Sequence, residues 1–252
     1  MLKHPLTRGL DIDNPQTTAL RRKIINSKPF LKCIYMEWYQ LIAAATGTGD
    51  DYPVLEIGSG AGFLQEHVAG AITSDVLPVP GLDVVMDGCQ LPLLSDSLDG
   101  VVMVNVFHHI SDVMAFMKEA ARCTRIGGKM VMIEPWVTPW SNFVYRNFHH
   151  EPCNPSAVEW MIPEGGPLSV ANSALPWIVF ERDRGKLKEE VPEWELQQVN
   201  PFMPFRYLLS GGIARRSLMP YILYPFWEWM EKMLSPWNKY LGMFALIELK
   251  RC

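Results

Sequence analysis

Residues 54–63 read VLEIGSGAGF, an apolar run that passes directly into three glycines at alternate positions. The run has the length and composition of a buried strand, and the glycines predict a sharp turn at its end. Because glycine has no Cβ, a ligand can lie directly against the backbone of such a turn. A dinucleotide fingerprint would need glycine or alanine at position 63, where Phe63 stands. The stretch therefore predicts the ligand-binding strand and turn of an α/β protein, and it disfavours NAD as the ligand.

Strands and helices alternate after this stretch with short connections. Further strands are expected at 71–75, 82–87, 100–106 and 129–134, with a short helix at 63–69 and a longer one at 113–124 that Gly127 and Gly128 end. The fourth strand is continuously apolar, as a strand covered on both faces requires. The pattern predicts a Rossmann-like, mostly parallel seven-stranded sheet with helices on both faces. Its ligand crevice is expected at the carboxyl ends of the strands.

The segments around this core are expected to elaborate a single domain over residues 1–252. Four parts are predicted: an N-terminal helical extension (1–49) whose helix breaks at Pro29, the binding core (50–135), an insertion after the fifth strand (136–193), and a C-terminal part (194–252). The insertion is rich in proline and tryptophan, and we expect it to cap the active site. The C-terminal part contains strands at 195–199 and 242–249 and an aromatic segment at 221–240.

Composition limits the partners and the compartment. A net charge of -4 gives no general attraction to a phosphate backbone, so a nucleic-acid substrate is not expected. The five cysteines are scattered and never form a C-x-x-C pair, which favours reduced thiols over disulfides or a zinc site. We find neither an N-terminal apolar run of signal-peptide length nor a stretch of about 18 uncharged apolar residues. A cytoplasmic protein without a membrane span is expected.

Several motifs together resemble the class I S-adenosylmethionine-dependent methyltransferases, particularly the group with ubiquinone- and sterol-type small-molecule enzymes. The resemblance covers about residues 54–135 and rests on the glycine turn after Glu56, on Asp75, on Asp87-Gly88 with Leu91-Pro92-Leu93 and Ser97-Leu98-Asp99, on Asn105-Val106-Phe107-His108-His109-Ile110, and on Gly127-Gly128-Lys129. It implies S-adenosylmethionine as cofactor and in-line methyl transfer to a small or lipid-like acceptor. The residues that the resemblance implies for cofactor binding are Glu56, Gly58, Ser59, Gly60, Gly62, Asp75, Asp87, Gly88, Asn105 and Phe107.

Elementary chemistry supports two of these roles independently. A vicinal diol offers two donors that one carboxylate accepts together, which suits Asp75 at the end of the second strand. Glu56 lies inside a strand, where an unpaired charge is disfavoured, so a cationic or hydrogen-bonding partner is expected. The amino group of the cofactor would serve.

Catalytic candidates follow from position. A sulfonium is already an activated leaving group, so a general base is needed only if the acceptor must lose a proton. The ends of the fourth and fifth strands place His108, His109 and Glu134 toward the crevice, and His149-His150-Glu151 in the insertion is a further candidate. No metal site is expected, because the adjacent histidines of that run point in different directions and no third ligand follows at helical spacing.

Aromatic residues gather after the fifth strand and in the segment 221–240. They predict core packing, an acceptor pocket or contact with a membrane surface. Two other functions stay open. A non-catalytic regulatory or scaffold protein that binds S-adenosylmethionine would carry the same cofactor motifs, and an NAD-dependent dehydrogenase would share the fold but is disfavoured by Phe63.

Overall fold

The computed structural model describes residues 11–47, 52–148, 151–163 and 165–252. Within these residues seven strands form one sheet in the order β3-β2-β1-β4-β5-β7-β6. The strands are β1 (Val54–Glu56), β2 (Ile72–Asp75), β3 (Val84–Val85), β4 (Leu98–Val104), β5 (Thr124–Pro135), β6 (Trp194–Phe202) and β7 (Phe244–Arg251). The first five are parallel, and β7 runs antiparallel to both β5 and β6. The predicted mostly parallel α/β sheet is confirmed.

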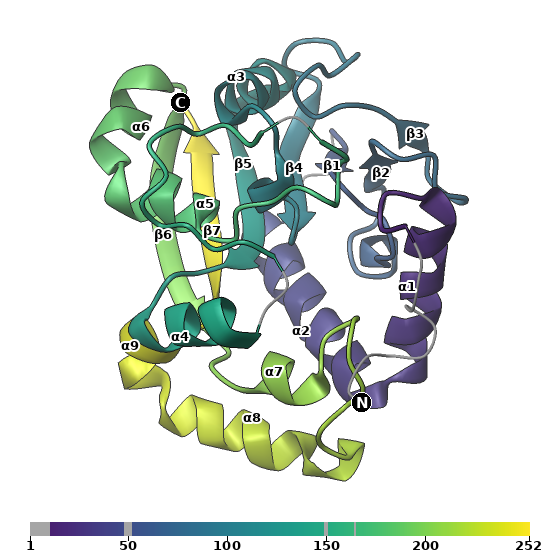
Figure 1. Ribbon diagram of the computed structural model, residues 1–252. Coiled ribbons are helices and arrows are strands. Elements are labelled where there is room, and N and C mark those ends of the chain that lie inside the picture. The colour runs from purple at the N-terminus through teal and green to yellow at the C-terminus, as the bar shows by residue number, and fades with distance from the viewer. Residues whose placement is uncertain (1–10, 48–51, 149–150, 164) are drawn as a thin grey trace.

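Two hydrophobic cores cover the two faces of this sheet (Figure 1). Successive strand residues point to opposite faces, so Val101 and Met103 of β4 enter one core while Val102 enters the other. Helix α3 (Val113–Cys123) packs on the first face, and α2 (Pro29–Thr46) packs on the second. The continuously apolar sequence of β4 is therefore explained by burial on both sides.

The N-terminal extension forms the two predicted helices. Helix α1 (Pro15–Ser27) begins after Asn14, whose side chain accepts a hydrogen bond from the backbone N–H of Gln16 at 2.9 Å. Helix α2 begins at Pro29, where the fixed φ of proline suits the first helical position. The break expected at this proline is confirmed.

The insertion consists of short helices and long irregular stretches. It contains α4 (Pro139–Phe148), α5 (Leu175–Trp177), the π-helical turn η4 (Ile178–Arg182) and α6 (Arg184–Glu190). Its backbone N–H at Asn172 donates to the carbonyl of His108 at 3.0 Å, just beyond the end of β4. The carboxylate of Asp13 accepts hydrogen bonds from the N–H groups of Leu168 at 2.7 Å and Ser169 at 3.1 Å. The insertion therefore joins the N-terminal extension to the end of β4.

A buried ion network ties the C-terminal helices to the N-terminal extension. These helices are α7 (Arg206–Ser210), η5 (Tyr221–Leu223), α8 (Tyr224–Met233), η6 (Ser235–Trp237) and α9 (Asn238–Leu241). Arg206 donates to both carboxylate oxygens of Glu37 on α2, at 2.6 and 2.9 Å, and also pairs with Glu231 on α8. The hydroxyl of Tyr224 donates to Glu37 at 3.0 Å. Elements far apart in sequence are thus held through one guanidinium.

Three local predictions are wrong. The helix expected at 63–69 is only a 3-10 turn, η2 (Leu64–Glu66), and the third strand is reduced to two residues. Gly127 and Gly128 do not end a helix, because α3 ends at Cys123 and both glycines lie within β5. Pairing with β4 shifts between Leu98 and Gly100 there, and a Cβ on Gly128 would lie 2.6 Å from the carbonyl oxygen of Asp99. Gly128 thus permits a close approach of the two strands, and Gly127 supplies the positive φ of +83° beside it.

We predict that Arg206→Ala lowers the free energy of unfolding by about 3–5 kcal/mol, because removing one partner leaves the buried Glu231 carboxylate unpaired. Lys232→Ala is the control, since Lys232 forms an exposed pair with Glu228 worth at most about 0.5 kcal/mol. Urea unfolding measures both variants. Equal effects of the two substitutions would contradict the proposed importance of the network.

Candidate functional site

The turn after β1 lies between β2 and the end of β4. Gly58 has φ +66°, and a Cβ there would lie 2.5 Å from a methyl carbon of Val106. The N–H of Ser59 donates to the carbonyl of Ser74 at 2.8 Å, and the Ser74 hydroxyl donates to the carbonyl of Glu56 at 2.7 Å. Only glycine at position 58 combines this backbone conformation with this close approach.

Asp75 closes β2 beside the glycine turn. Its Oδ2 accepts a hydrogen bond from the N–H of Gly60 at 3.0 Å, and its Oδ1 accepts one from the N–H of Leu77 at 2.9 Å. Partial burial raises the pKa of the carboxyl, against the effect of these hydrogen bonds. A carboxylate has about four acceptor positions, so Asp75 retains capacity to accept from a ligand. It lies where the sequence predicts a residue that binds a ribose.

Glu56 is a buried carboxylate whose Oε2 has no hydrogen-bond partner within the part of the chain that the structure describes. Burial raises the pKa of this carboxyl to about 7, opposed by a hydrogen bond from Ser59 and reinforced by the charge of Asp75. The hydroxyl oxygen of Thr18 on α1 is also buried without a partner. Orphaned acceptors of this kind beside a glycine turn fit a ligand that donates hydrogen bonds or carries positive charge.

The N-terminal helices cover the glycine turn. A Cβ on Gly62 would collide with the hydroxyl of Tyr39 on α2, which accepts a hydrogen bond from the N–H of Phe63 at 3.3 Å. A Cβ on Gly60 would lie 3.4 Å from the methyl carbon of Thr18. Beside the turn is a hollow lined by Arg22, Glu56, Ser59, Gly60, Gly62, Phe63, Leu64, Gln65, Glu66, Thr73, Pro80, Gly81 and Leu82. The hydroxyl of Tyr39 therefore explains why position 62 requires glycine in this structure.

Asp87 and Gly88 lie beyond β3, at the same edge of the sheet as Asp75. Asp87 is exposed, and its Oδ1 accepts a hydrogen bond from the N–H of Cys89 at 2.9 Å, so its carboxylate stabilises its own turn. A Cβ on the buried Gly88 would lie 3.2 Å from the ring of Phe116. Gly88 thus permits this turn to pack against α3.

The chain turns sharply after β4, and Glu134 at the end of β5 holds the turn. Asn105 has φ +56°, a conformation that asparagine tolerates better than most residues. Glu134 is fully buried, and its Oε1 accepts hydrogen bonds from the N–H groups of Val106 at 2.7 Å and Phe107 at 2.8 Å. The Phe107 ring is buried against Phe180 at 5.0 Å between centroids. Any cofactor contact at Phe107 therefore falls to its backbone.

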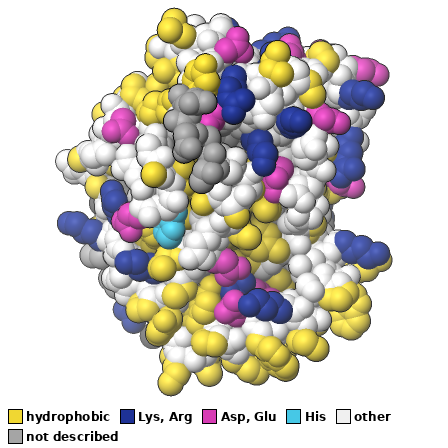
Figure 2. Space-filling view, turned by 180° about the vertical axis from the view of Figure 1, so that it is seen from behind, with side chains coloured by type: hydrophobic (Ala, Val, Ile, Leu, Met, Phe, Trp, Pro, Cys, Tyr) yellow, Lys and Arg dark blue, Asp and Glu magenta, His cyan; other side chains and the backbone are white. Residues whose placement is uncertain are grey.

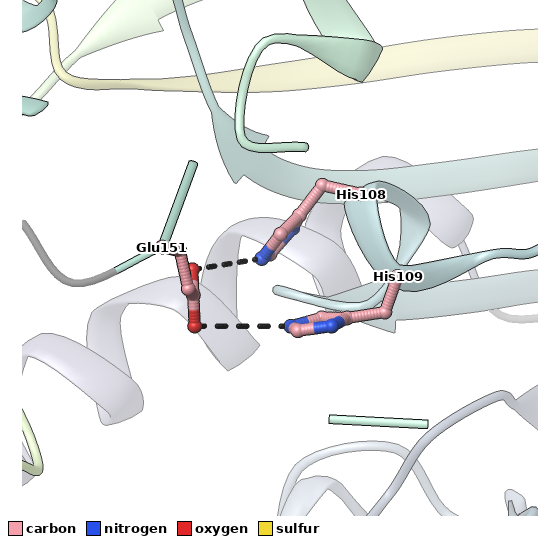
Figure 3. Close-up of side chains that lie close together, drawn as sticks. All are labelled: His108, His109 and Glu151. Carbon is pink, nitrogen blue, oxygen red and sulfur yellow. Dashed lines mark ion pairs between the residues drawn. The ribbon is translucent and has the colours of Figure 1, made fainter. Parts of the chain in front are cut away.

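His108 lies between two carboxylates. Its Nδ1 is 2.7 Å from Oε2 of Glu134, and its Nε2 is 3.5 Å from Oε2 of Glu151 (Figure 3). Burial lowers the pKa of His108, but the charge and hydrogen bond of Glu134, with a smaller effect of Glu151, outweigh burial and raise the pKa to about 9. The imidazole is therefore protonated near neutral pH in this state.

His109 has the opposite electrostatics. Its Nδ1 lies 3.0 Å from the carbonyl oxygen of Val170, and its Nε2 lies 3.9 Å from Oε1 of Glu151. Burial and the neighbouring charge of His108 lower the pKa of His109 to about 4. The neutral ring donates Nδ1–H to the carbonyl and presents an unprotonated Nε2.

The structure thus brings the three predicted catalytic residues, His108, His109 and Glu134, together. It adds Glu151 from the insertion to them. His149 and His150, predicted with Glu151 as a further candidate, lie outside the described residues. The sequence gives no signal for Tyr39 or Thr18, because both belong to helices whose spacing indicates only packing.

Comparisons with known proteins agree with this geometry. Residues 55–132 match the model of a family described as a methyltransferase domain. No curated protein has a significant sequence match to the chain.

Three solved structures illustrate the likeness of fold. A chain in a complex between the Trm112 methyltransferase activator and a methyltransferase from Haloferax volcanii is 12% identical with a TM-score of 0.55, over 96% of this chain and 98% of that one. A geranyl diphosphate C-methyltransferase from Streptomyces coelicolor is 12% identical with a TM-score of 0.54, over 99% and 89%. An S-adenosylmethionine-dependent methyltransferase from Thermotoga maritima is 15% identical with a TM-score of 0.54, over 92% and 98%.

The methyltransferase domain matched over residues 55–132, with its strand order and glycine turn, supports a class I S-adenosylmethionine-dependent methyltransferase. Its cofactor is S-adenosylmethionine. The described residues fit this molecule. The orphaned oxygen of Glu56 suits an ammonium group, and the remaining acceptor positions of Asp75 suit a ribose diol.

We predict that Glu56→Gln changes the pH dependence of stability of the cofactor-free protein. The folded-state pKa of about 7 lies above the ordinary 4.5, so the favourable contribution of the protonated carboxyl is complete below the ordinary value and is lost as the pH rises through about 7. Between roughly pH 5 and pH 8 the wild type should lose up to about 3 kcal/mol more of its free energy of unfolding than the variant, because His108 and His109 titrate in both proteins. Urea unfolding of both proteins at both pH values measures this loss. If wild type and variant differ by the same free energy of unfolding at pH 5 and at pH 8, the raised pKa of Glu56 is contradicted.

We also predict that Asp75→Asn weakens S-adenosylmethionine binding by roughly 10- to 100-fold, because charge-assisted hydrogen bonds to the ribose are lost. Asp83→Asn is the matched control, since Asp83 lies in the neighbouring β2–β3 connection and accepts its hydrogen bonds from Thr73 of β2 and Gln65 of η2. Calorimetry gives both dissociation constants. Wild-type affinity in the Asp75 variant would show that this carboxylate does not hold the cofactor.

Proposed function

We propose that this methyltransferase acts on a small, lipid-like acceptor of ubiquinone or sterol type, which it meets at a membrane surface. The observation that carries the proposal is an apolar stripe on the outside of the C-terminal helices. Exposed side chains at the spacing of successive helical turns form it, and we call it the C-terminal stripe: Ile222, Phe226, Trp229, Met233, Trp237 and Tyr240. All six are at least half exposed, with Ile222 at 81% and Met233 at 64%.

Helix α8 carries apolar side chains on two faces, because Trp227 packs against the second core while other aromatic residues stay exposed. Its inner face carries the buried Tyr224 and Glu231, which bind Arg206, while its outer face carries Phe226 and Trp229. A surface helix normally points its apolar side chains at the core. Hydrophobic side chains gather along the lower edge of the molecule in Figure 2, the edge that α8 occupies in Figure 1. Contiguous exposed apolar surface of this kind marks an interaction site.

Charge complementarity favours an anionic bilayer as the occupant. Arg215, Arg216, Lys232 and Lys239 are exposed in α8, α9 and the connection before them; Lys232 pairs with Glu228, and Lys239 lies 4.9 Å from the ring centre of Tyr240. Helices that rest in a membrane interface combine tryptophan and aliphatic side chains on one face with lysine and arginine beside it. Within the described residues, the structure contains no helix long and apolar enough to cross a membrane. We therefore propose peripheral contact, on the cytoplasmic side, where the five free cysteines would stay reduced.

A protein of similar fold binds a substrate with an apolar chain. The structure from Streptomyces coelicolor holds geranyl diphosphate. Another compared structure is a complex with an activator protein, so a protein partner on the C-terminal stripe is the competing occupant.

For methyl transfer we propose that the chain mainly positions its ligands. Bound S-adenosylmethionine supplies an electrophilic methyl on a sulfonium that is ready to leave. The glycine turn, Glu56 and Asp75 orient the nucleoside and its amino acid, and the insertion over His108 and His109 excludes water. Glu134 is a positioning residue that fixes the turn after β4 and the ring of His108.

The function is tested with labelled S-adenosylmethionine and lipid vesicles prepared from host extracts. The wild type should transfer the label to an extractable lipid, whereas a non-catalytic cofactor-binding protein would bind the cofactor and transfer nothing. The variant Phe226→Glu/Trp229→Glu should bind anionic vesicles at least about tenfold more weakly, because the burial of two aromatic side chains is lost. It should also methylate vesicle-borne lipid more slowly, with cofactor affinity unchanged.

Leu94→Glu is the matched control, because Leu94 is 81% exposed but lies on the connection before β4. Wild-type vesicle binding in the double variant would refute the membrane contact. Self-association of the wild type that the double variant abolishes, without vesicle binding, would instead assign the C-terminal stripe to a protein partner.

A further inference from the structure

Three potential metal-ligating atoms converge at the end of β4. His108 and His109 occupy the 3-10 turn η3 (Phe107–His109), and Glu151 approaches from the insertion, so both rings point toward one carboxylate (Figure 3). The Nε2 atoms lie 3.5 Å and 3.9 Å from the two oxygens of Glu151, and one ligand atom from each of the three residues falls within 4.8 Å of the others.

These separations suit a shared metal better than direct hydrogen bonds. Hydrogen bonds between nitrogen and oxygen have lengths of about 2.7–3.2 Å, and both contacts to Glu151 are longer. Bonds of about 2.0–2.1 Å to Zn²⁺ place tetrahedral ligand atoms roughly 3.4 Å apart. The three ligand atoms, which lie within 4.8 Å of one another, would have to draw closer together to reach this separation.

The other nitrogen of each ring is already held in the way that metal sites require. Nδ1 of His108 lies 2.7 Å from Glu134, whose other oxygen accepts two backbone N–H groups, and Nδ1 of His109 lies 3.0 Å from the carbonyl oxygen of Val170. Metal-binding histidines almost always donate this second N–H to a carboxylate or a carbonyl, which fixes the ring and aims the free nitrogen at the ion. The cluster has one partner of each kind, and an ion bound to Nε2 of His108 would displace to solvent the proton that this ring carries in the metal-free state.

The surroundings also leave access for an ion. The side chains of His108, His109 and Glu151 are 3%, 11% and 21% exposed, so the cluster is mostly desolvated and opens on the side of Glu151. Three protein ligands leave a fourth position for water or an oxygen of the acceptor. Two imidazoles with one carboxylate select first-row transition ions over Mg²⁺ or Ca²⁺, which prefer oxygen.

We propose that His108, His109 and Glu151 form a binding site for a divalent transition-metal ion, with Zn²⁺ as the representative ion. No metal site is predicted from the sequence, because the run His149-His150-Glu151 is the only candidate that its local spacing suggests. In the structure two histidines about 40 residues earlier, carried by a turn that directs both rings the same way, approach Glu151. The site does not depend on the identity of the acceptor.

The test is Zn²⁺ binding by the metal-free full chain, measured by competition with a chromophoric chelator. The wild type should bind one Zn²⁺ per chain, and Glu151→Gln and His109→Gln should each weaken binding by roughly tenfold or more. Co²⁺ should give the visible absorption bands of a four- or five-coordinate ion, and both variants should weaken them. Glu159→Gln, an exposed carboxylate in the same insertion, should bind as the wild type does.

Unfolding curves without metal show whether the variants fold. Glu151 is partly exposed, so Glu151→Gln is expected to retain its structure, whereas the fully paired His108 is not substituted. Absence of stoichiometric Zn²⁺ binding in the wild type would overturn the proposal. So would unchanged affinity in folded Glu151→Gln and His109→Gln proteins. Because the readout is binding, failure here is distinguishable from failure of the proposed lipid methylation.

Discussion

The buried carboxylate of Glu134 is the constraint on which the arrangement of the site depends. Burying a carboxylate is costly unless hydrogen bonds compensate it, and Glu134 has two backbone N–H donors and His108. Glu134 belongs to β5, and the N–H groups that donate to it lie in the turn after β4. It therefore holds that turn in one position against β5. That position sets Val106 against Gly58 on the cofactor side. It also directs Nε2 of His108 away from Glu134 and toward the insertion. Glu134 therefore positions both the cofactor side of the site and the histidine side.

The cofactor side is built against the N-terminal helices as much as against the sheet. Tyr39 lies where a side chain at Gly62 would otherwise project, and Thr18 borders Gly60. The hollow beside the turn is lined by both the turn and Arg22 of α1. A nucleoside lying on this turn would therefore also contact α1. The insertion reaches the same end of the sheet through His108, His109 and Asp13. The N-terminal helices and the insertion, both outside the matched methyltransferase domain, thus meet at the same end of the sheet.

The sequence predicts the fold well where periodicity and glycine spacing carry the information. The strand and turn at 54–62, the split at Pro29 and the strands β2, β4, β5, β6 and β7 are all recognisable before folding. Gly127 and Gly128 are misread because a glycine pair after a helix normally ends it, whereas here Gly127 supplies a positive φ and Gly128 a close approach of β4 and β5. The pairing of His108 and His109 with Glu151, and of Arg206 with Glu37 and Glu231, depends on contacts between distant segments, which no local pattern encodes. The outward-facing stripe of α8 is visible as an aromatic segment, but its direction is known only once the helix is packed.

The central claim is that the glycine turn after β1 and the Glu134-held turn after β4 together form the cradle of a sulfonium nucleoside. A crystal structure with S-adenosylhomocysteine tests it most directly. The account predicts ribose hydroxyls on Asp75, the amino group near Glu56, and the sulfur facing the turn that carries His108. A nucleoside bound elsewhere, or one on this turn with Asp75 directed away from its sugar, would contradict it.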